Sequence, residues 1–412
     1  MRVESRTAGI VVKPSRSLWR NRSFLLIWAS GIASTIGLQV YTIVIPLLVY
    51  EMSQSALAMS GMRVMEFLPN VLLGMVAGVI VDRVNRKKVM LATLCIQWLA
   101  LTFLLILLLM HSMQLWSLFL LGFIFSSAGY FNGNAVHSIL PQVISKDQLT
   151  EANAKMSFAS TLVRMIGPGI AGLILAAGSF AGTLFIQFLC ISLALISICF
   201  LHSPKLEIEK NKQSFWADMK EGINELFRNK TLLTPTIATI FQNFASSMVL
   251  GVLIFFAVDT LGSTESQVGF MISFGAIGGL LGAIAVKKLT TYIPRGKLYT
   301  YTILGDGLGY LLLFVADTWW VIGLSLAVRT FAITVSNVLY FAIRQEFTPN
   351  HMLGRVAGTS SMLMKLALPA GLLAAGLWAE WYELRILFVF TIVITLMIFF
   401  CMLKTAFYRK VT

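Results

Sequence analysis

Charged residues are scarce in this chain of 412 residues. Only 12% of the residues are Asp, Glu, Lys or Arg, while 57% are hydrophobic and the mean hydropathy is +0.81. An average soluble domain has about 25% charged residues. A chain with half that share cannot cover a water-facing surface, so the composition excludes a soluble globular protein and indicates one that lies within a lipid bilayer.

Histidine and cysteine are also scarce, with four of each. The cysteines lie inside apolar runs, where we interpret them as small hydrophobic residues with reduced thiols. Neither residue type has the spacing of a zinc site, and the P-loop pattern G-x-x-x-x-G-K-S/T is absent. We therefore expect no metal, no cofactor and no drive by ATP. A membrane enzyme would need clustered histidines or paired carboxylates, so we expect the chain not to be an enzyme.

Long apolar runs fill most of the sequence. About 20 apolar residues in a helix span the hydrocarbon core of a bilayer. The runs lie at residues 24–50, 57–81, 89–110, 115–138, 153–178, 181–201, 232–258, 267–286, 298–316, 319–343, 356–378 and 385–407. They predict twelve membrane-spanning helices, and an even number places both termini on the same side.

Lys and Arg decide which side that is. They are concentrated in the N-terminal tail, in the loops after the second, fourth, sixth, eighth and tenth runs, and at the C-terminal end, whereas the opposite face carries only Arg385. The positive-inside rule therefore predicts a cell-membrane protein with both termini in the cytoplasm. Basic loops beside anionic lipid headgroups account for the formal net charge of +14. No soluble segment is large enough for a nucleic-acid surface, so we expect the lipid bilayer and no nucleic acid as a partner.

The longest polar segment, 202–231, divides the chain into two halves. Its apolar residues recur at helical spacing, which predicts an amphipathic helix over 215–228 lying on the inner leaflet. The predicted organisation is a cytoplasmic tail, a six-helix bundle, a cytoplasmic linker, a second six-helix bundle and a short cytoplasmic tail, at residues 1–23, 24–201, 202–231, 232–407 and 408–412.

The two halves repeat each other weakly. Residues 140–147 after the fourth run resemble residues 343–350 after the tenth, and the run that follows each has a central proline, Pro168 or Pro369. Repeats of this kind are typical of transporters, whose binding site lies where the repeats meet. We therefore predict an all-α fold of two pseudo-symmetric six-helix bundles.

The hairpin between the second and third runs carries the clearest motif. It reads Gly78-Val-Ile-Val-Asp82-Arg83-Val-Asn-Arg86-Lys87-Lys88. The lysines are explained by topology alone, whereas Gly78 permits close helix approach and Asp82 is the only acid in a basic loop. The pattern G-x-x-x-D-R-x-x-R-K-K resembles the signature loop between helices 2 and 3 of the major facilitator superfamily.

A second motif lies in the fifth run, Arg164-Met-Ile-Gly167-Pro168-Gly169-Ile-Ala-Gly172. It is explained equally well as a kinked packing helix. It also resembles the helix 5 motif of exporters in the same superfamily, in the R-x-x-G-P variant of macrolide-efflux and siderophore-efflux transporters. Together with Pro46–Tyr50 and Leu353–Val356, the resemblance to this drug:proton antiporter branch, the third such family, covers nearly the whole chain.

The resemblance implies a latch that holds one conformation shut. Asp82 would contact the other half and the basic residues of its own loop, and the G-P-x-x-G core would seal the interface between halves. The second copy of the loop has Val286 in place of the Asp, so the latch is one-sided. The expected latch residues are Gly78, Asp82, Arg83, Arg86, Gly167, Pro168, Gly172 and Arg355.

Ionisable residues inside membrane spans are expensive and suggest function. Glu66 is the only deep carboxylate of the first half, so it is the leading proton carrier, although Arg63 could pair with it on the same helix. In the resembling fold helices 2 and 11 face each other, so we expect Glu66 and Lys365 to pair in one conformation and to separate in the other. Asp306 is either structural or a third proton-coupling residue.

The helices that line the cavity in the resembling fold carry amides among aromatic side chains. These candidate substrate residues are Gln39, Tyr41, Tyr130, Asn132, Asn134, Gln242, Asn243 and Asn337, together with the deep cations Arg164 and Arg329. They suit an amphiphilic organic molecule better than a small ion. The sequence thus predicts a monomeric secondary active transporter that exports a drug-, antibiotic- or siderophore-like small molecule by proton antiport and alternating access. A lysolipid or nutrient carrier of the same fold, or a membrane sensor that transports nothing, are the alternatives.

Overall fold

The computed structural model of the chain describes residues 17–73, 84–202 and 215–411, and nearly all of them are helical. The helices of the first half are α1 (Arg22–Ser53), α2 (Ala56–Leu72), α4 (Arg86–Leu109), α5 (Leu115–Val143), α6 (Leu149–Ala177) and α7 (Phe180–Cys199). Those of the second half are α9 (Lys230–Phe255), α10 (Glu265–Tyr292), α11 (Arg295–Phe314), α12 (Trp319–Phe347), α13 (Leu353–Trp381) and α14 (Leu384–Leu403).

Shorter elements connect or extend these helices. The helix α8 (Phe215–Arg228) precedes α9, a π-helical turn η3 (Phe256–Thr260) continues α9, and α15 (Ala406–Lys410) follows α14. The single 3₁₀ turns are η1 (Leu18–Arg20), η2 (Lys146–Gln148) and η4 (Asn350–Met352). The segment that was expected to be an amphipathic helix is thus α8.

Ten helices within the described ranges are long and apolar enough to cross a membrane. The two remaining apolar runs are occupied by α2, whose 17 described residues end at Leu72, and by the 20-residue α11. The all-α membrane fold predicted from the sequence is therefore confirmed. Several helices run past their predicted ends, for example α5 to Val143 and α12 to Phe347, because hydropathy marks the part of a helix in hydrocarbon and not its polar continuation.

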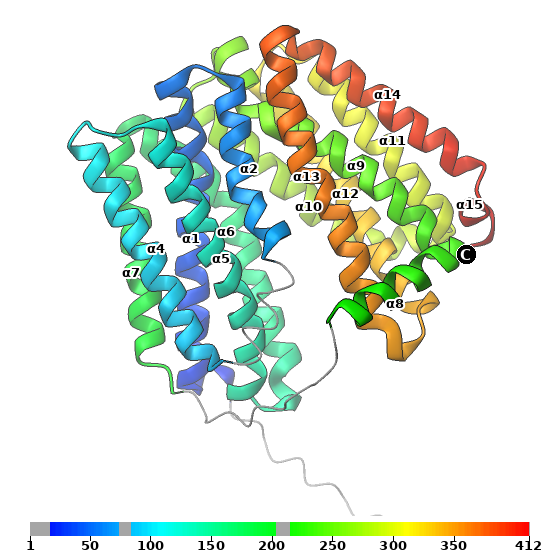
Figure 1. The fold of residues 1–412 in the computed structure, drawn as a ribbon, viewed down its shortest axis with the longest axis horizontal. Coiled ribbons are helices and arrows are strands. Elements are labelled where there is room, and N and C mark those ends of the chain that lie inside the picture. Colours follow the sequence, from blue (N-terminus) through cyan, green and yellow to red (C-terminus); the bar gives the residue numbers. More distant parts are fainter. Residues whose placement is uncertain (1–16, 74–83, 203–214, 412) are drawn as a thin grey trace, which may run out of the picture.

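The helices form two groups that stand side by side (Figure 1). In the first group α1 packs against α6 and α7, and α4 packs against α5 and α7. In the second group α12 packs against α10 and α11, while α9 packs against α13 and α14. The main contacts between the groups are α6 with α10 and α2 with α13. Four helices therefore make most of the interface.

Glycines and small residues let these helices approach to backbone contact. A Cβ atom at Gly172 of α6 would lie 2.5 Å from the carbonyl oxygen of Glu265 in α10. One turn earlier, the Gly169 amide donates a hydrogen bond of 3.1 Å to Ser273 Oγ. Ser60 Oγ of α2 also donates across the interface, to the carbonyl oxygen of Gly251 in α9 at 3.0 Å. Within the described ranges the interface is thus a close backbone fit with few polar contacts.

These contacts gather at one end of the molecule. Gly172 lies near the end of α6, Glu265 begins α10, and Ser60 lies one turn into α2. At the same end the Tyr50 hydroxyl donates to Asp259 Oδ1 of η3 at 3.1 Å. The two groups of helices are therefore joined at the end that holds the α1–α2 and η3–α10 turns.

The helix α8 packs on the second group, next to α13 (Figure 1). Leu226 is fully buried in a small apolar cluster with Leu232, Met352 and Val356. Glu221 of α8 forms an ion pair with Arg355 of α13. The apolar face of the amphipathic helix α8 therefore packs against protein.

The Gly172 contact predicts a matched test of the joined end. Gly172→Leu should push α6 from α10, because its side chain would meet the Glu265 backbone. Gly358→Leu is the control, since a Cβ atom there meets nothing within 4 Å. Spin labels on Glu51→Cys and Thr260→Cys, with the four native cysteines replaced, should report a longer distance in the first variant only. Equal distance distributions in both variants would contradict a packing role for Gly172.

Candidate functional site

A cavity of about 620 Å³ lies in the first group of helices, between α1, α2, α5 and α6. Of the predicted substrate residues, Tyr41, Tyr130, Asn132 and Arg164 line it, and so does Glu66. The Tyr41 ring stacks on Phe125 at 4.8 Å between centroids. The cavity therefore combines a flat aromatic wall with polar and charged groups, as a site for an amphiphilic molecule requires.

Two predicted residues of the first half lie elsewhere. Gln39 is 8% exposed and packs between α1 and α6, where a Cβ atom at Gly167 would come within 2.5 Å of its Cγ atom. Asn134 donates its amide to the Tyr130 carbonyl oxygen at 2.8 Å, on its own helix. Their roles in the structure are packing and a local hydrogen bond, because helix rotation decides which amide faces a cavity and one sequence does not show that rotation.

A smaller polar pocket of about 100 Å³ lies in the second group. Gln242 and Asn243 of α9 and Asn337 of α12 line it together with Asp306 of α11. The Asn243 amide also donates to the carbonyl oxygen of Met364 at 2.9 Å. The candidate substrate residues are thus divided between two separate pockets, of which the larger belongs to the first half.

Glu66 is paired within its own helix. Its Oε2 atom accepts a hydrogen bond of 2.8 Å from Arg63 Nη1, and both side chains are about one-tenth exposed. The second Arg63 nitrogen, Nη2, donates to the carbonyl oxygen of Thr42 at 3.3 Å. The i, i+3 pairing that the sequence allowed is therefore present, and it holds the carboxylate in the cavity wall.

Lys365 reaches across the interface without meeting Glu66. Its Nζ atom donates to Asn70 Oδ1 at 3.0 Å, so α13 is joined to α2 one turn from Glu66. Half of the expected pairing geometry is present, since Lys365 does face α2. The direct Glu66–Lys365 contact is absent from this conformation, in which Glu66 Oε2 pairs with Arg63 and Lys365 donates to Asn70.

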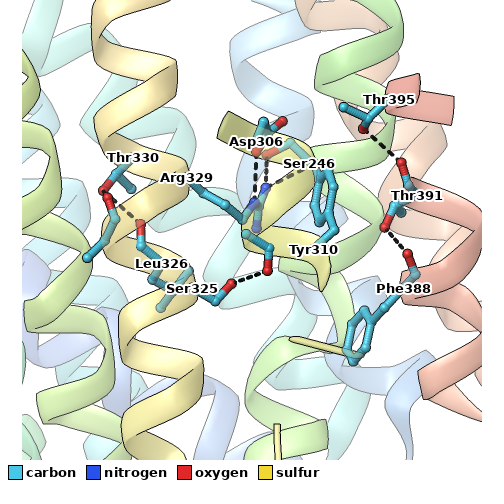
Figure 2. A network of polar contacts seen from close by, with 12 residues as sticks. Ser246, Asp306, Tyr310, Ser325, Leu326, Arg329, Thr330, Phe388, Thr391 and Thr395 are labelled. Atoms are coloured by element: carbon cyan, nitrogen blue, oxygen red, sulfur yellow. Dashed lines mark hydrogen bonds and ion pairs between the residues drawn. The ribbon is translucent and has the colours of Figure 1, made fainter. Parts of the chain in front are cut away.

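Arg329 and Asp306 form a buried ion pair between α12 and α11 (Figure 2). Arg329 Nε lies 2.9 Å from Asp306 Oδ1, and Nη2 donates to Ser246 Oγ at 2.9 Å and to the Tyr310 hydroxyl at 3.1 Å. The side chains of the pair are 5% and 2% exposed. Gly309 makes room for this arrangement, since a Cβ atom there would overlap the Arg329 side chain.

This network changes the predicted place of Arg329. Arg329 is predicted from the sequence to line the substrate cavity and Asp306 to belong to a separate proton-coupling set, whereas the structure brings them together. A charge buried in a membrane protein needs a partner, and adjacent helices supply it here. Tyr310 and Ser246 were missed; the spacing of Asp306 and Tyr310, one helical turn apart on α11, was the available signal.

Arg164 is exposed to the cavity of the first half and forms no hydrogen bond or ion pair with the part of the chain that the structure describes. Asn153, Ser157 and Ser160 line the same cavity from the same helix. Their spacing of three and four residues puts them on one face of α6 with Arg164. This polar face was not among the sequence predictions, although its periodicity is visible in the sequence.

The expected latch residues are only partly described. Gly78, Asp82 and Arg83 lie outside the described residues. Pro168 and Gly172 do meet α10, since a Cβ atom at Gly269 would contact the Pro168 carbonyl oxygen. The remaining three lie elsewhere.

Each of those three makes a described contact within one half. Gly167 packs on α1, as described above. Arg355 pairs with Glu221 of α8, and Arg86 is the first residue of α4, where the Asn85 side chain caps the helix.

The family model described as Major Facilitator Superfamily matches residues 24–371. The chain belongs to this superfamily. Its members are transporters, so the protein is a multi-pass membrane transporter and not an enzyme, as the sequence predicts.

Curated relatives within the Major Facilitator Superfamily are efflux proteins by name. Macrolide efflux protein A of Streptococcus pyogenes is 25% identical over 87% of this chain and 89% of that protein. Multidrug efflux pump Tap of Mycolicibacterium fortuitum is 23% identical over 86% and 89%. Enterobactin exporter EntS of Escherichia coli is 28% identical over 69% and 68%. The chain is similar to all three along most of its length.

Solved structures support the same fold. A mutant of the nucleoside transporter NupG superposes with a TM-score of 0.78 at 13% identity, over 92% of this chain and 98% of that one. A bacterial homologue of the iron transporter ferroportin, in an inward-facing state, gives 0.74 at 15% identity, over 94% and 99%. The superfamily fold is therefore present over nearly the whole chain.

The buried pair predicts a stability test. Arg329→Met alone should destabilise the protein by about 3–5 kcal/mol, because Asp306 would be left buried without its partner. The double variant Arg329→Met, Asp306→Leu should recover part of that loss, since no charge remains. Thermal unfolding in detergent measures both, with Glu151→Gln, which opens the exposed pair with Lys155, as control. A double variant no more stable than Arg329→Met would contradict the pairing argument.

Proposed function

We propose that this protein is a monomeric proton antiporter that exports an amphiphilic, drug- or siderophore-like small molecule from the cytoplasm. The observation that carries the proposal is the cavity of about 620 Å³ with Glu66 in its wall. The two groups of helices are in contact at one end of the molecule, which leaves the other end available for entry to this cavity. The names of the macrolide, multidrug and enterobactin efflux relatives support the substrate class.

The distribution of Lys and Arg indicates which end of the protein faces the cytoplasm. With both termini in the cytoplasm, the joined end that holds the α1–α2 turn faces outward. The conformation is then inward-facing. The basic residues at the opposite ends of the helices would lie beside the cytoplasmic leaflet.

The interface is suited to alternating access because its polar contacts between described residues are few single hydrogen bonds. The neutral bond from Ser60 to Gly251 contributes about 0.5–1.5 kcal/mol. The bonds with one charged partner, Tyr50 to Asp259 and Lys365 to Asn70, contribute about 1.5–3 kcal/mol each. The rest is apolar and backbone contact, which two rigid bundles can exchange for similar contact at the other end. The joined end is therefore able to open at modest cost.

Glu66 is our proposed proton carrier because it is a carboxylate in the wall of the larger cavity. A carboxylate paired with a guanidinium is stabilised in its charged form, and one left alone in a dry interface prefers a proton. Movement of α13 past α2 would carry Lys365 from Asn70 towards Glu66 or away from it. A change of partner at Glu66 is how we propose that proton binding and conformation are coupled.

Asp306 is the second candidate for proton coupling. It lines the smaller pocket and is 2% exposed, held by Arg329. Its burial favours a structural role, because a proton would have to reach it through a polar pocket of about 100 Å³. We therefore propose Glu66, before Asp306, as the proton-coupling residue.

Glu66→Gln should abolish proton-driven accumulation in everted membrane vesicles while a substrate still binds, because the amide cannot exchange a proton. A catecholate siderophore and a fluorescent dye, offered with an imposed proton gradient, are suitable probes. Glu151→Gln, on the exposed start of α6, is the matched control. Accumulation at the wild-type rate with unchanged pH dependence in Glu66→Gln would show that Glu66 is structural.

The same vesicles separate the alternatives. A membrane sensor would bind probes without any accumulation, and a carrier for lysolipids or nutrients would accumulate those and not the drugs. A panel that includes a macrolide, a catecholate siderophore, a lysophospholipid and a nucleoside decides among them.

A further inference from the structure

We infer that the exported molecule carries an anionic group and that Arg164 binds that group in the cavity of the first half. The inference rests on the exporter function proposed above and narrows its substrate to amphiphilic organic acids. It starts from the charge that this part of the structure leaves without a partner.

The deep cations of the described spans differ in their partners. Arg63 has Glu66, and Arg329 has Asp306. Lys365 has the neutral amide of Asn70. Arg164 forms no ion pair or hydrogen bond with any described residue, although its guanidinium has five N–H donors.

The depth of Arg164 makes this lack of a partner costly. It lies near the middle of the 29-residue α6, about 20 Å from either helix end at 1.5 Å per residue. A charge at that depth is tolerated where it faces a water-filled cavity or a ligand. Arg164 lines the cavity, so its guanidinium is available to whatever enters.

The net charge of the cavity wall is positive. Its charged lining residues, within the described ranges, are Arg63, Glu66 and Arg164. The only carboxylate among them is already neutralised by Arg63. A cationic substrate would therefore find no free carboxylate here and would be repelled by Arg164, whereas an anionic one would complete the missing pair.

The surroundings of Arg164 define the rest of the molecule. The hydroxyls of Ser157 and Ser160 line the same face of α6, and Phe67 and Tyr130 line the wall with aromatic surface. A guanidinium binds carboxylate, phosphate or sulfonate oxygens through two parallel hydrogen bonds. The expected ligand thus joins one acidic group to an aromatic or aliphatic body, and 620 Å³ is enough for a drug-sized molecule.

A matched pair of fluorescent probes tests the charge preference. Anilinonaphthalene sulfonate and N-phenylnaphthylamine share one ring system and differ in the sulfonate. Binding of each to the full-length protein in lipid nanodiscs is measured by fluorescence, with empty nanodiscs subtracted. The wild type should bind the sulfonate more tightly than the uncharged parent.

Arg164→Gln should weaken binding of the sulfonate by about 10- to 100-fold, the range expected for hydrogen bonds to a charged group. Arg164→Lys should retain part of the preference, because it keeps the charge but not the paired donors. Binding of the uncharged parent should not change in either, which shows that the cavity is intact. Ser160→Trp should weaken both probes by filling the cavity, and Arg22→Gln, an exposed arginine on α1, should affect neither.

Equal binding of the two probes by the wild type, or an equal loss of both in Arg164→Gln, would overturn the inference. Proton-driven export of a cationic dye that Arg164→Gln leaves unchanged would also overturn it, while leaving the exporter function in place. Conversely, sulfonate binding that depends on Arg164 without any accumulation in vesicles would retain the anion site and remove the exporter function.

Discussion

The free-energy cost of placing a charged side chain in hydrocarbon determines how the deep cations of this transporter are surrounded. A charged group in a membrane span must be paired, hydrogen-bonded or exposed to water, and each deep cation that the structure describes meets the requirement differently. Arg329 is enclosed with Asp306, Tyr310 and Ser246, so that part of the second half behaves as a packed core. Arg164 is left open to a cavity.

The interface between the halves meets a different constraint. Two bundles that slide must fit closely without strong, specific bonds, and backbone contact through glycine achieves this. Gly172 of α6 faces the start of α10 at a distance that excludes a side chain, and a Cβ atom at Gly169 would lie 3.2 Å from the Phe270 ring. Because lipid and protein interior are similarly apolar, such close packing and a few hydrogen bonds hold the joined end. The Gly-Pro motif is therefore interpretable as a packing surface, whatever its role in the transport cycle.

Sequence alone could predict the fold because the bilayer imposes it. A hydrophobic run of the right length has one stable conformation in lipid, so the helices and their order followed from composition. The site could be predicted only in part. Helix rotation separates Tyr130, which faces the cavity, from Asn134 one turn later, which bonds to its own backbone. The pairing of Arg329 with Asp306 depends on which helices are neighbours, and no local pattern encodes that.

The two halves are similar in topology but differ in their chemistry. The first has the large cavity with an uncompensated guanidinium, and the second has a small polar pocket beside a neutralised pair. A ligand that entered between them would find its charged contact on α6 and only amides and hydroxyls on α9 and α12. Such a ligand would be held mainly by the first half. The amides of the second half would then form only weaker hydrogen bonds with it. Under this condition, binding can shift one bundle against the other without trapping the substrate between them.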